Sequence, residues 1–418
     1  MKKVILFGGN FGPDQGRISG YMVKFANAIS KMPEVELTAI HGGSVDYINS
    51  YLNPDMPLNI GQYDIVLWFP NISNDEEKTV SSIKKKFPKI ILVASKNNRD
   101  GKYFPQDLIS RMLSVKSNLC LEFLTAQVGP SPKIAANLLD PLGNAFITGE
   151  IDIPKIARAV ITRSIQLCEY TRMGSKSIGT LGGRKIPDDP RFFEAARKRA
   201  EEFHSLIHPA EGVARFLGNL SFRCEKGFPS YRGEDGFIFV TRRNVDKCAI
   251  TQESFVPARL EIRSMQSVHN STPVSSEVVT VGYLGDVKPS VDTPVQVALY
   301  HAYKNVNYMI HSHVYVKDGI FTEEVIPCGA LEEAIEILRI QPDRDLDNFS
   351  INLLGHGSIV FSRDLDYLES RIYMAREIPE IQPLRSMPAE SSMIDCGPEM
   401  PPIQLNYVQL PMRAQKPR

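Results

Sequence analysis

The chain has 418 residues, of which 43% are hydrophobic and 23% are charged. This length supports two or three domains with well-formed cores, and the composition is that of an ordinary globular protein. Lysine plus arginine and aspartate plus glutamate number 48 each, so the chain has no overall field that would recruit nucleic acid or an anionic membrane. This balance argues against a nonspecific polyanion binder.

The N-terminal residues and the cysteines indicate a cytoplasmic protein. The apolar run from Val4 to Phe7 is far too short for the core of a signal peptide, and no later run approaches the roughly 18 apolar residues that cross a bilayer. Six cysteines lie far apart without a CxxC pair, which fits reduced thiols better than a disulfide framework.

The first 170 residues alternate between strand and helix patterns. Apolar runs of strand type predict strands at residues 3–7, 36–40, 64–69, 89–94 and 118–123. Helical patterns occupy residues 21–30, 74–86, 104–115 and 152–170. Strands separated by helices predict a doubly wound parallel sheet, so we expect a Rossmann-like or flavodoxin-like domain at residues 1–170.

A glycine-rich loop follows the first predicted strand, where such sheets bind ligands. Its spacing matches neither GxGxxG nor GxxxxGK[ST]. Two interpretations stay open: the backbone N–H groups bind a phosphate or nucleotide, or the glycines form turns and Ser19 caps the next helix. Polar or aromatic segments at other strand ends fall on the same edge of the sheet: 41–44, 68–71 and 95–96.

The second half of the chain contains a second domain. Glycines, serines and prolines between Met173 and Pro190 predict a linker at residues 171–190. A helix is expected to follow at residues 191–206, and the second domain is predicted at residues 191–378. Six prolines between Pro379 and Pro402 exclude a long helix in the tail, residues 379–418.

Three histidines and one aspartate of the second domain have spacing that suggests chemistry. The apolar run of residues 308–310 predicts a strand, and His311 and His313 would share one face of its continuation. His356 lies between two glycines further along. Asp292 precedes Thr293-Pro294 and an apolar helix, so it either caps that helix or acts in a site.

Taken in order, short motifs of this region resemble those of the class II aldolase and adducin-like family. The family pattern runs GNxS, TPSG, PSSE with TPxH, HTH and an NHG-type turn. This chain has GNLS at 218–221, TRRN at 241–244, PSVD at 289–292, TPVQ at 293–296, HSH at 311–313 and GHG at 355–357. The resemblance covers roughly residues 192–374 and implies a class II aldolase-like α/β/α domain.

The resemblance implies a divalent-metal site. His311, His313 and His356 match the metal ligands of the family, with Zn²⁺ as the usual ion and Mn²⁺, Fe²⁺ or Co²⁺ as alternatives. Asp292 stands where the family's aldolases carry the catalytic glutamate, and related pentulose-phosphate 4-epimerases resemble this chain in having an aspartate there. Asp292 is thus expected to be a base, a fourth ligand or both.

The resemblance also implies where an anionic substrate binds. The family's phosphate-binding positions correspond to Asn219, Ser221, Thr241 and Ser290, which keep the family's residue types. Val291 replaces the second serine of PSSE. Arg243 replaces a serine in the TPSG-like turn, and its guanidinium offers two donors to a phosphate or carboxylate.

These features together predict an aldolase-like lyase, which makes or breaks a carbon–carbon bond in a small hydroxylated carbonyl compound through a metal-stabilised enediolate. Three alternatives are an epimerase of the same fold, a non-catalytic adducin-like module, and a bifunctional enzyme whose N-terminal domain handles a nucleotide. The family resemblance also implies a homo-oligomer, of the tetrameric kind.

Overall fold

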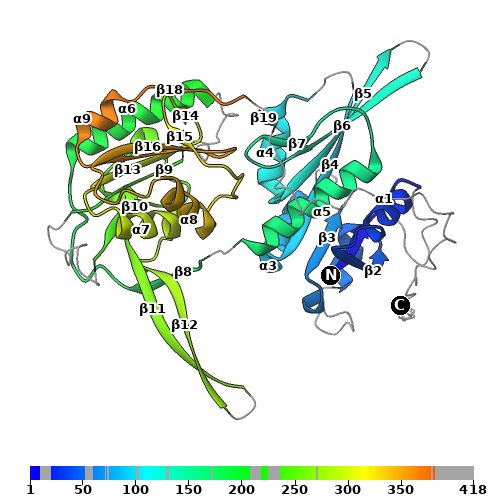
Figure 1. Ribbon diagram of the computed structural model, residues 1–418, viewed down its shortest axis with the longest axis horizontal. Coiled ribbons are helices and arrows are strands. Elements are labelled where there is room, and N and C mark those ends of the chain that lie inside the picture. The colour runs from blue at the N-terminus through cyan, green and yellow to red at the C-terminus, as the bar shows by residue number, and fades with distance from the viewer. Residues whose placement is uncertain are drawn as a thin grey trace, which may run out of the picture. The chain divides into compact units, whose positions relative to one another are not determined.

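The computed structural model describes residues 1–9, 20–51, 60–70, 72, 75–99, 103–128, 131–170, 173–207, 218–224, 236–269, 272–377 and 380–381. The chain forms two compact units (Figure 1). Unit 1 comprises Met1–Glu169 and Ile378–Arg418, and unit 2 comprises Tyr170–Glu377. Within the described ranges no helix is both long and apolar enough to cross a membrane.

Unit 1 is built on one sheet with the strand order β2-β1-β3-β4-β5-β6-β7-β19. Its first five strands are parallel and confirm the predicted ones: β1 Lys2–Gly8, β2 Val35–His41, β3 Ile65–Phe69, β4 Ile90–Arg99 and β5 Leu119–Val128. The order 2-1-3-4-5 is the flavodoxin-like one. Two antiparallel strands that the sequence analysis did not predict, β6 Ser131–Leu139 and β7 Asn144–Ile147, extend the sheet beyond β5.

Helices cover both faces of this sheet. They are α1 Gly20–Ser30, α2 Val45–Tyr51, α3 Glu77–Lys86, α4 Pro105–Val115 and α5 Ile153–Glu169. Helix α1 packs against α5, and α3 packs against α4 (Figure 1). Val4, Ile5, Leu6 and Phe7 are all completely buried, which requires cover on both faces because strand side chains alternate.

Unit 2 is an α/β/α layer structure around a sheet with the order β15-β16-β17-β13-β9-β10-β11-β12-β8. The central strands pair antiparallel: β16 Asn348–Leu353, β17 Gly357–Ser362, β13 Tyr308–Ser312, β9 Asn219–Phe222 and β10 Ile238–Thr241. Short strand β15 Ile320–Phe321 pairs parallel with β16. A separate two-stranded sheet joins β14 Tyr315–Val316 to β18 Tyr373–Met374.

Two apolar clusters attach helices to the two faces of this sheet (Figure 1). Phe192 and Phe203 of α6 Pro190–Ile207 pack with Phe222 and with Leu368 of α9 Leu365–Ser370. On the other face, α7 Thr293–Ala302 packs with α8 Leu331–Ile340. Aromatic rings also stack in this core: the ring centroids of Phe349 and Phe361 lie 4.2 Å apart.

Strands β11 Phe255–His269 and β12 Thr272–Leu284 continue beyond the sheet as a long two-stranded arm (Figure 1). The segment predicted as a linker is not only a linker: its residues Ser175–Gly179 form β8, which pairs parallel with β12. Likewise, β19 Glu380–Ile381 at the start of the tail pairs with β7, and the tail from residue 382 lies outside the described residues. These strands are short, and their pairing depends on partners far away in the sequence.

Candidate metal centre

The three predicted histidines meet at the ends of the central strands β13 and β17 of the unit 2 sheet. One ring nitrogen from each of His311, His313 and His356 lies within 4.8 Å of the other two. Their ring centroids are 4.6 to 5.3 Å apart. The expectation that His311 and His313 share the face of one strand needs correction: β13 ends at Ser312, because the chain turns there, and His313 lies in the bend that follows.

Two glycines allow the neighbouring backbone to approach the His311–His313 segment closely. Gly218 precedes β9 with φ +80°, and Gly357 begins β17 with φ +147°. A Cβ atom on Gly218 would lie 2.0 Å from the carbonyl oxygen of His311, and one on Gly357 would lie 1.9 Å from that of Ser312. Only glycine fits at both positions, so the GN and HG motifs have a steric function here.

Hydrogen bonds orient two of the rings. His311 Nδ1–H donates to the carbonyl oxygen of Ser358 at 2.9 Å, and His356 Nδ1 lies 2.6 Å from Glu333 Oε1. Both bonds leave Nε2 pointing elsewhere. Within the described part of the chain, Nε2 of His311, Nδ1 of His313 and Nε2 of His356 are buried and have no hydrogen-bond partner. Buried polar atoms are normally paired, so this trio fits a metal ion.

Burial keeps two of the imidazoles in the neutral form that binds metals. It lowers the pKa of His311 to about 4 and the pKa of His313 well below its usual value. For His356, burial also acts to lower the pKa, but the adjacent Glu333 carboxylate outweighs it, so the pKa of His356 is raised. A carboxylate that accepts from the second nitrogen of a ligating histidine is a common support in metal sites.

Asp292 directs its carboxylate toward the histidines. It occupies the N-cap position of α7, yet its side chain makes no capping hydrogen bond. Instead, Asp292 Oδ2 accepts from the Asn219 amide at 2.7 Å and lies 3.8 Å from His311 Nε2. Asp292 Oδ1 accepts from the Cys328 thiol at 2.8 Å. The capping alternative is thus not realised by the side chain, and the carboxylate lies beside the candidate metal position.

Three residues in or near this site were not among those predicted from the sequence: Glu333, Cys328 and Lys247. Glu333 is 2% exposed and faces inward from α8, together with Ala334 and Ile337. An acidic residue on the buried face of an amphipathic helix is a signal that could have revealed it. Cys328 and Lys247 offered no such signal, because neither lies in a helix or strand that the sequence predicts.

Three of the five residues predicted to bind an anion, Asn219, Ser221 and Thr241, are buried. Asn219 uses its Oδ1 to accept from Gln296, and Ser221, completely buried, donates from Oγ to the Tyr300 hydroxyl at 3.3 Å. Thr241 Oγ1 accepts from the backbone N–H of Leu220 at 3.2 Å. These three side chains therefore already have protein partners, and phosphate binding by them stays a prediction.

Two further predicted residues lie on the loop beside Asp292. Ser290 is half-buried, and its backbone N–H donates to the carbonyl of Thr241. Arg243 is exposed, and its Nε donates to the carbonyl of Pro289 at 3.1 Å. Asn244, which replaces the glycine of the TPSG-like turn, has φ +58°, a conformation that asparagine tolerates. Asn244 thus preserves the backbone conformation of the turn, while Arg243 adds a positive charge to the surface of the turn.

In unit 1, the glycine loop continues to residue 19, and residues 10–19 lie outside the described residues, so its ligand stays a prediction. The neighbouring strand ends do come together. Gly43 N–H donates to the carbonyl of Gly9 at 2.8 Å, and Trp68 Nε1–H donates to the carbonyl of Gly43 at 2.8 Å. Trp68 is completely buried, so it is part of the core.

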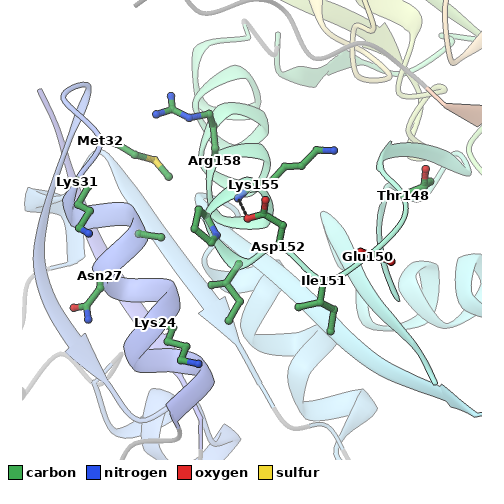
Figure 2. A pocket seen from close by; sticks show the side chains of 13 residues that line it. Lys24, Asn27, Lys31, Met32, Thr148, Glu150, Ile151, Asp152, Lys155 and Arg158 are labelled. Atoms are coloured by element: carbon green, nitrogen blue, oxygen red, sulfur yellow. Dashed lines mark hydrogen bonds between the residues drawn. The ribbon is translucent and has the colours of Figure 1, made fainter. Parts of the chain in front are cut away.

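A groove of about 1080 Å³ in unit 1 lies along α1 and α5 (Figure 2). Its lining includes Lys24 of α1, Lys31 directly after α1, and Lys155 and Arg158 of α5. Arg158 is paired with Glu34 at 3.3 Å, and acidic side chains also contribute to the lining. Because its lining carries charges of both signs, the groove does not indicate one class of ligand.

Comparison with known families supports the assignment of unit 2. The family described as "Class II Aldolase and Adducin N-terminal domain" matches residues 202–316, which confirms the resemblance for that part of the chain. The match includes Asp292, His311 and His313, whereas Glu333 and His356 lie beyond it.

Other comparisons add little. No curated protein matches the chain. Among solved structures, a DNA/pantothenate metabolism flavoprotein from Streptococcus pneumoniae is similar to 40% of this chain and 98% of its own, at 12% sequence identity and a TM-score of 0.26. A structural similarity with a TM-score this low does not establish a shared fold.

The contact between Glu333 and His356 leads to a testable prediction. Replacing Glu333 with glutamine removes the charge that orients and polarises His356, so we expect zinc affinity to fall about 10- to 100-fold. Competition with a coloured chelator measures this affinity directly. Glu332→Gln, on the same turn of α8 but half-exposed, is the matched control and should bind zinc as the wild type does. Equal affinity in both variants would contradict this function of Glu333.

Proposed function

We propose that unit 2 is a divalent-metal-dependent lyase of the aldolase type, which forms or cleaves a carbon–carbon bond in a small hydroxylated carbonyl substrate. One observation carries the proposal: three buried ring nitrogens, from His311, His313 and His356, converge without a hydrogen-bond partner among the described residues. The family match over residues 202–316 supports the same class of chemistry.

The residues of the site would serve two functions, metal binding and proton transfer. His311, His313 and His356 would hold the ion, with Zn²⁺ favoured by three nitrogen ligands and Mn²⁺, Fe²⁺ or Co²⁺ as alternatives. A divalent ion bound there supplies a Lewis acid for substrate oxygens. Asp292 would take up and return the proton, because its carboxylate lies next to this position and is held in place by Asn219 and Cys328.

An epimerase of the same fold is the second candidate. It is favoured by Asp292 itself, since the related 4-epimerases resemble this chain in having an aspartate where the aldolases have glutamate. A non-catalytic adducin-like module is disfavoured because the three histidines are retained and their rings converge. Assembly into a homo-oligomer remains a proposal based on the family resemblance.

Metal content tests the proposal. The double variant His311→Ala/His313→Ala should lose the metal that purified wild-type protein carries, about one ion per chain, because two of three nitrogen ligands are removed. Elemental analysis of the purified proteins measures this, with circular dichroism to show that both are folded. His204→Ala, an exposed histidine of α6, serves as the control and should keep its metal. Full metal content in the double variant would exclude the three-histidine site.

A further inference from the structure

Lys247 is a buried lysine for which the described residues provide no partner. It begins the short 3₁₀ helix Lys247–Ala249, shortly after the turn at residues 241–244, and its side chain is 5% exposed. Asp246, its neighbour, uses its carboxylate to cap this helix and accepts from the backbone N–H of Cys248 at 2.9 Å. Within the described residues the Lys247 ammonium makes no hydrogen bond and no ion pair.

The charge of Lys247 acts on the candidate metal centre. Burial lowers its pKa, whereas the carboxylates of Asp246 and Asp292 act to raise it. In return, the ammonium contributes to the lowered pKa values of His311 and His313. The backbone places Lys247 in this region as well: it follows the turn at residues 241–244, where the Thr241 carbonyl accepts from Ser290 N–H at 2.9 Å, two residues before Asp292.

The contacts among the described residues do not explain why a lysine is buried at position 247. Removing most of a lysine side chain from water without an ion-pair partner among the described residues costs free energy, and an apolar side chain of the same length would fill the space without that cost. Asp292 does not compensate by contact: the hydrogen bonds of its carboxylate among the described residues come from Asn219 and Cys328, and none comes from Lys247. A ligand that brings its own negative charge would provide the missing partner.

Other cations near the site are already engaged. Arg243 is exposed and donates to the carbonyl of Pro289, and Arg376 lies over the Tyr315 ring, 5.7 Å from its centroid. With a divalent ion in place, that ion and Lys247 together exceed the charge of Asp292 and Glu333 by at least one positive unit. The site as a whole is thus suited to an anion.

We propose that Lys247 binds an anionic oxygen group of the substrate, a carboxylate or a phosphate, beside the three-histidine site. This inference rests on the proposed function and narrows it: the substrate is a small hydroxylated carbonyl compound whose anionic group lies near the carbons that react. Lys247 would then be a substrate-binding residue, in addition to the residues that the family resemblance implies.

Anion binding by variants tests this assignment. Calorimetric titrations with inorganic phosphate and with glycolate are made on zinc-loaded and on metal-free protein, for wild type, Lys247→Met and Lys247→Arg. We expect wild type to bind at least one probe, Lys247→Met to bind it about tenfold more weakly or worse, and Lys247→Arg to stay within a few-fold of wild type. Lys288→Met, on the exposed loop before Asp292, is the control and should bind as wild type does.

The outcomes separate the possibilities. Binding of phosphate alone assigns a phosphorylated substrate, and binding of glycolate alone assigns a carboxylated one. Unchanged anion affinity in Lys247→Met, or no binding of either probe to wild type, would overturn the assignment. A lower melting temperature of Lys247→Met without anion would mean that the lysine is structural, since we expect an equal or higher one. If that variant does not fold, Lys247→Gln replaces it.

The metal-free titrations keep this inference distinguishable from the proposed function. If wild-type protein neither carries nor binds a metal ion, the metal site is contradicted. Anion binding that depends on Lys247 would still be seen in that protein. Conversely, a metal-loaded protein whose anion affinity ignores Lys247 would contradict only the assignment of Lys247.

Discussion

Replacing Gly218 with alanine is expected to destabilise the protein by roughly 3 kcal/mol or more and to abolish metal binding. The added Cβ would lie 2.0 Å from the His311 carbonyl oxygen, so β9 and β13 must separate. Because φ at this position is +80°, the alanine backbone is strained as well. Separation of these strands moves His311 away from its two partner rings. Urea unfolding measures the stability, and elemental analysis measures the metal.

Two further variants show whether the effect is local. Gly357→Ala should behave like Gly218→Ala, since its Cβ would lie 1.9 Å from the Ser312 carbonyl oxygen. Gly285→Ala is the matched control: its φ is also positive, +101°, but apart from its chain neighbours no atom of the described residues lies within 4 Å of the added Cβ. It should cost only about 1–2 kcal/mol of backbone strain and keep its metal. Similar losses for Gly285→Ala and Gly218→Ala would show that close packing around His311 is not the cause.

Replacing Asp292 with asparagine is expected to lower the rate of proton transfer by about 10²- to 10⁴-fold, while zinc remains bound. Asparagine has nearly the same shape and can still contact Asn219 and Cys328, but it cannot take up a proton. Exchange of the hydrogen next to the carbonyl for deuterium, followed by NMR, measures the rate. Small hydroxylated carbonyl compounds with a phosphate or a carboxylate are the test substrates.

The control for this experiment is Asp286→Asn, an exposed aspartate six positions earlier. It should exchange deuterium at the wild-type rate. If Asp292→Asn loses its zinc, Asp292 acts as a fourth ligand, and if it exchanges as fast as wild type, Asp292 is not the base.

Much of the local structure was predictable because the patterns are local. The five parallel strands of unit 1 appeared as apolar runs, and α4, α5 and α6 began and ended within one residue of their predicted bounds. Strands β6, β7 and β8 were not predicted, because none of them is a long apolar run and each depends on pairing with a neighbouring strand.

The residue types of the site can be read from the sequence: three histidines, an aspartate, and the glycines of the GNLS and GHG motifs. How they meet depends on the tertiary structure. The placement of β13 between β9 and β17 brings Gly218 and Gly357 against the His311–His313 segment, and α8 brings Glu333 to His356. Cys328 and Lys247 reach Asp292 or its surroundings from positions 36 and 45 residues away (328 − 292 and 292 − 247). Such contacts depend on strand order and burial, which no local pattern of residues encodes.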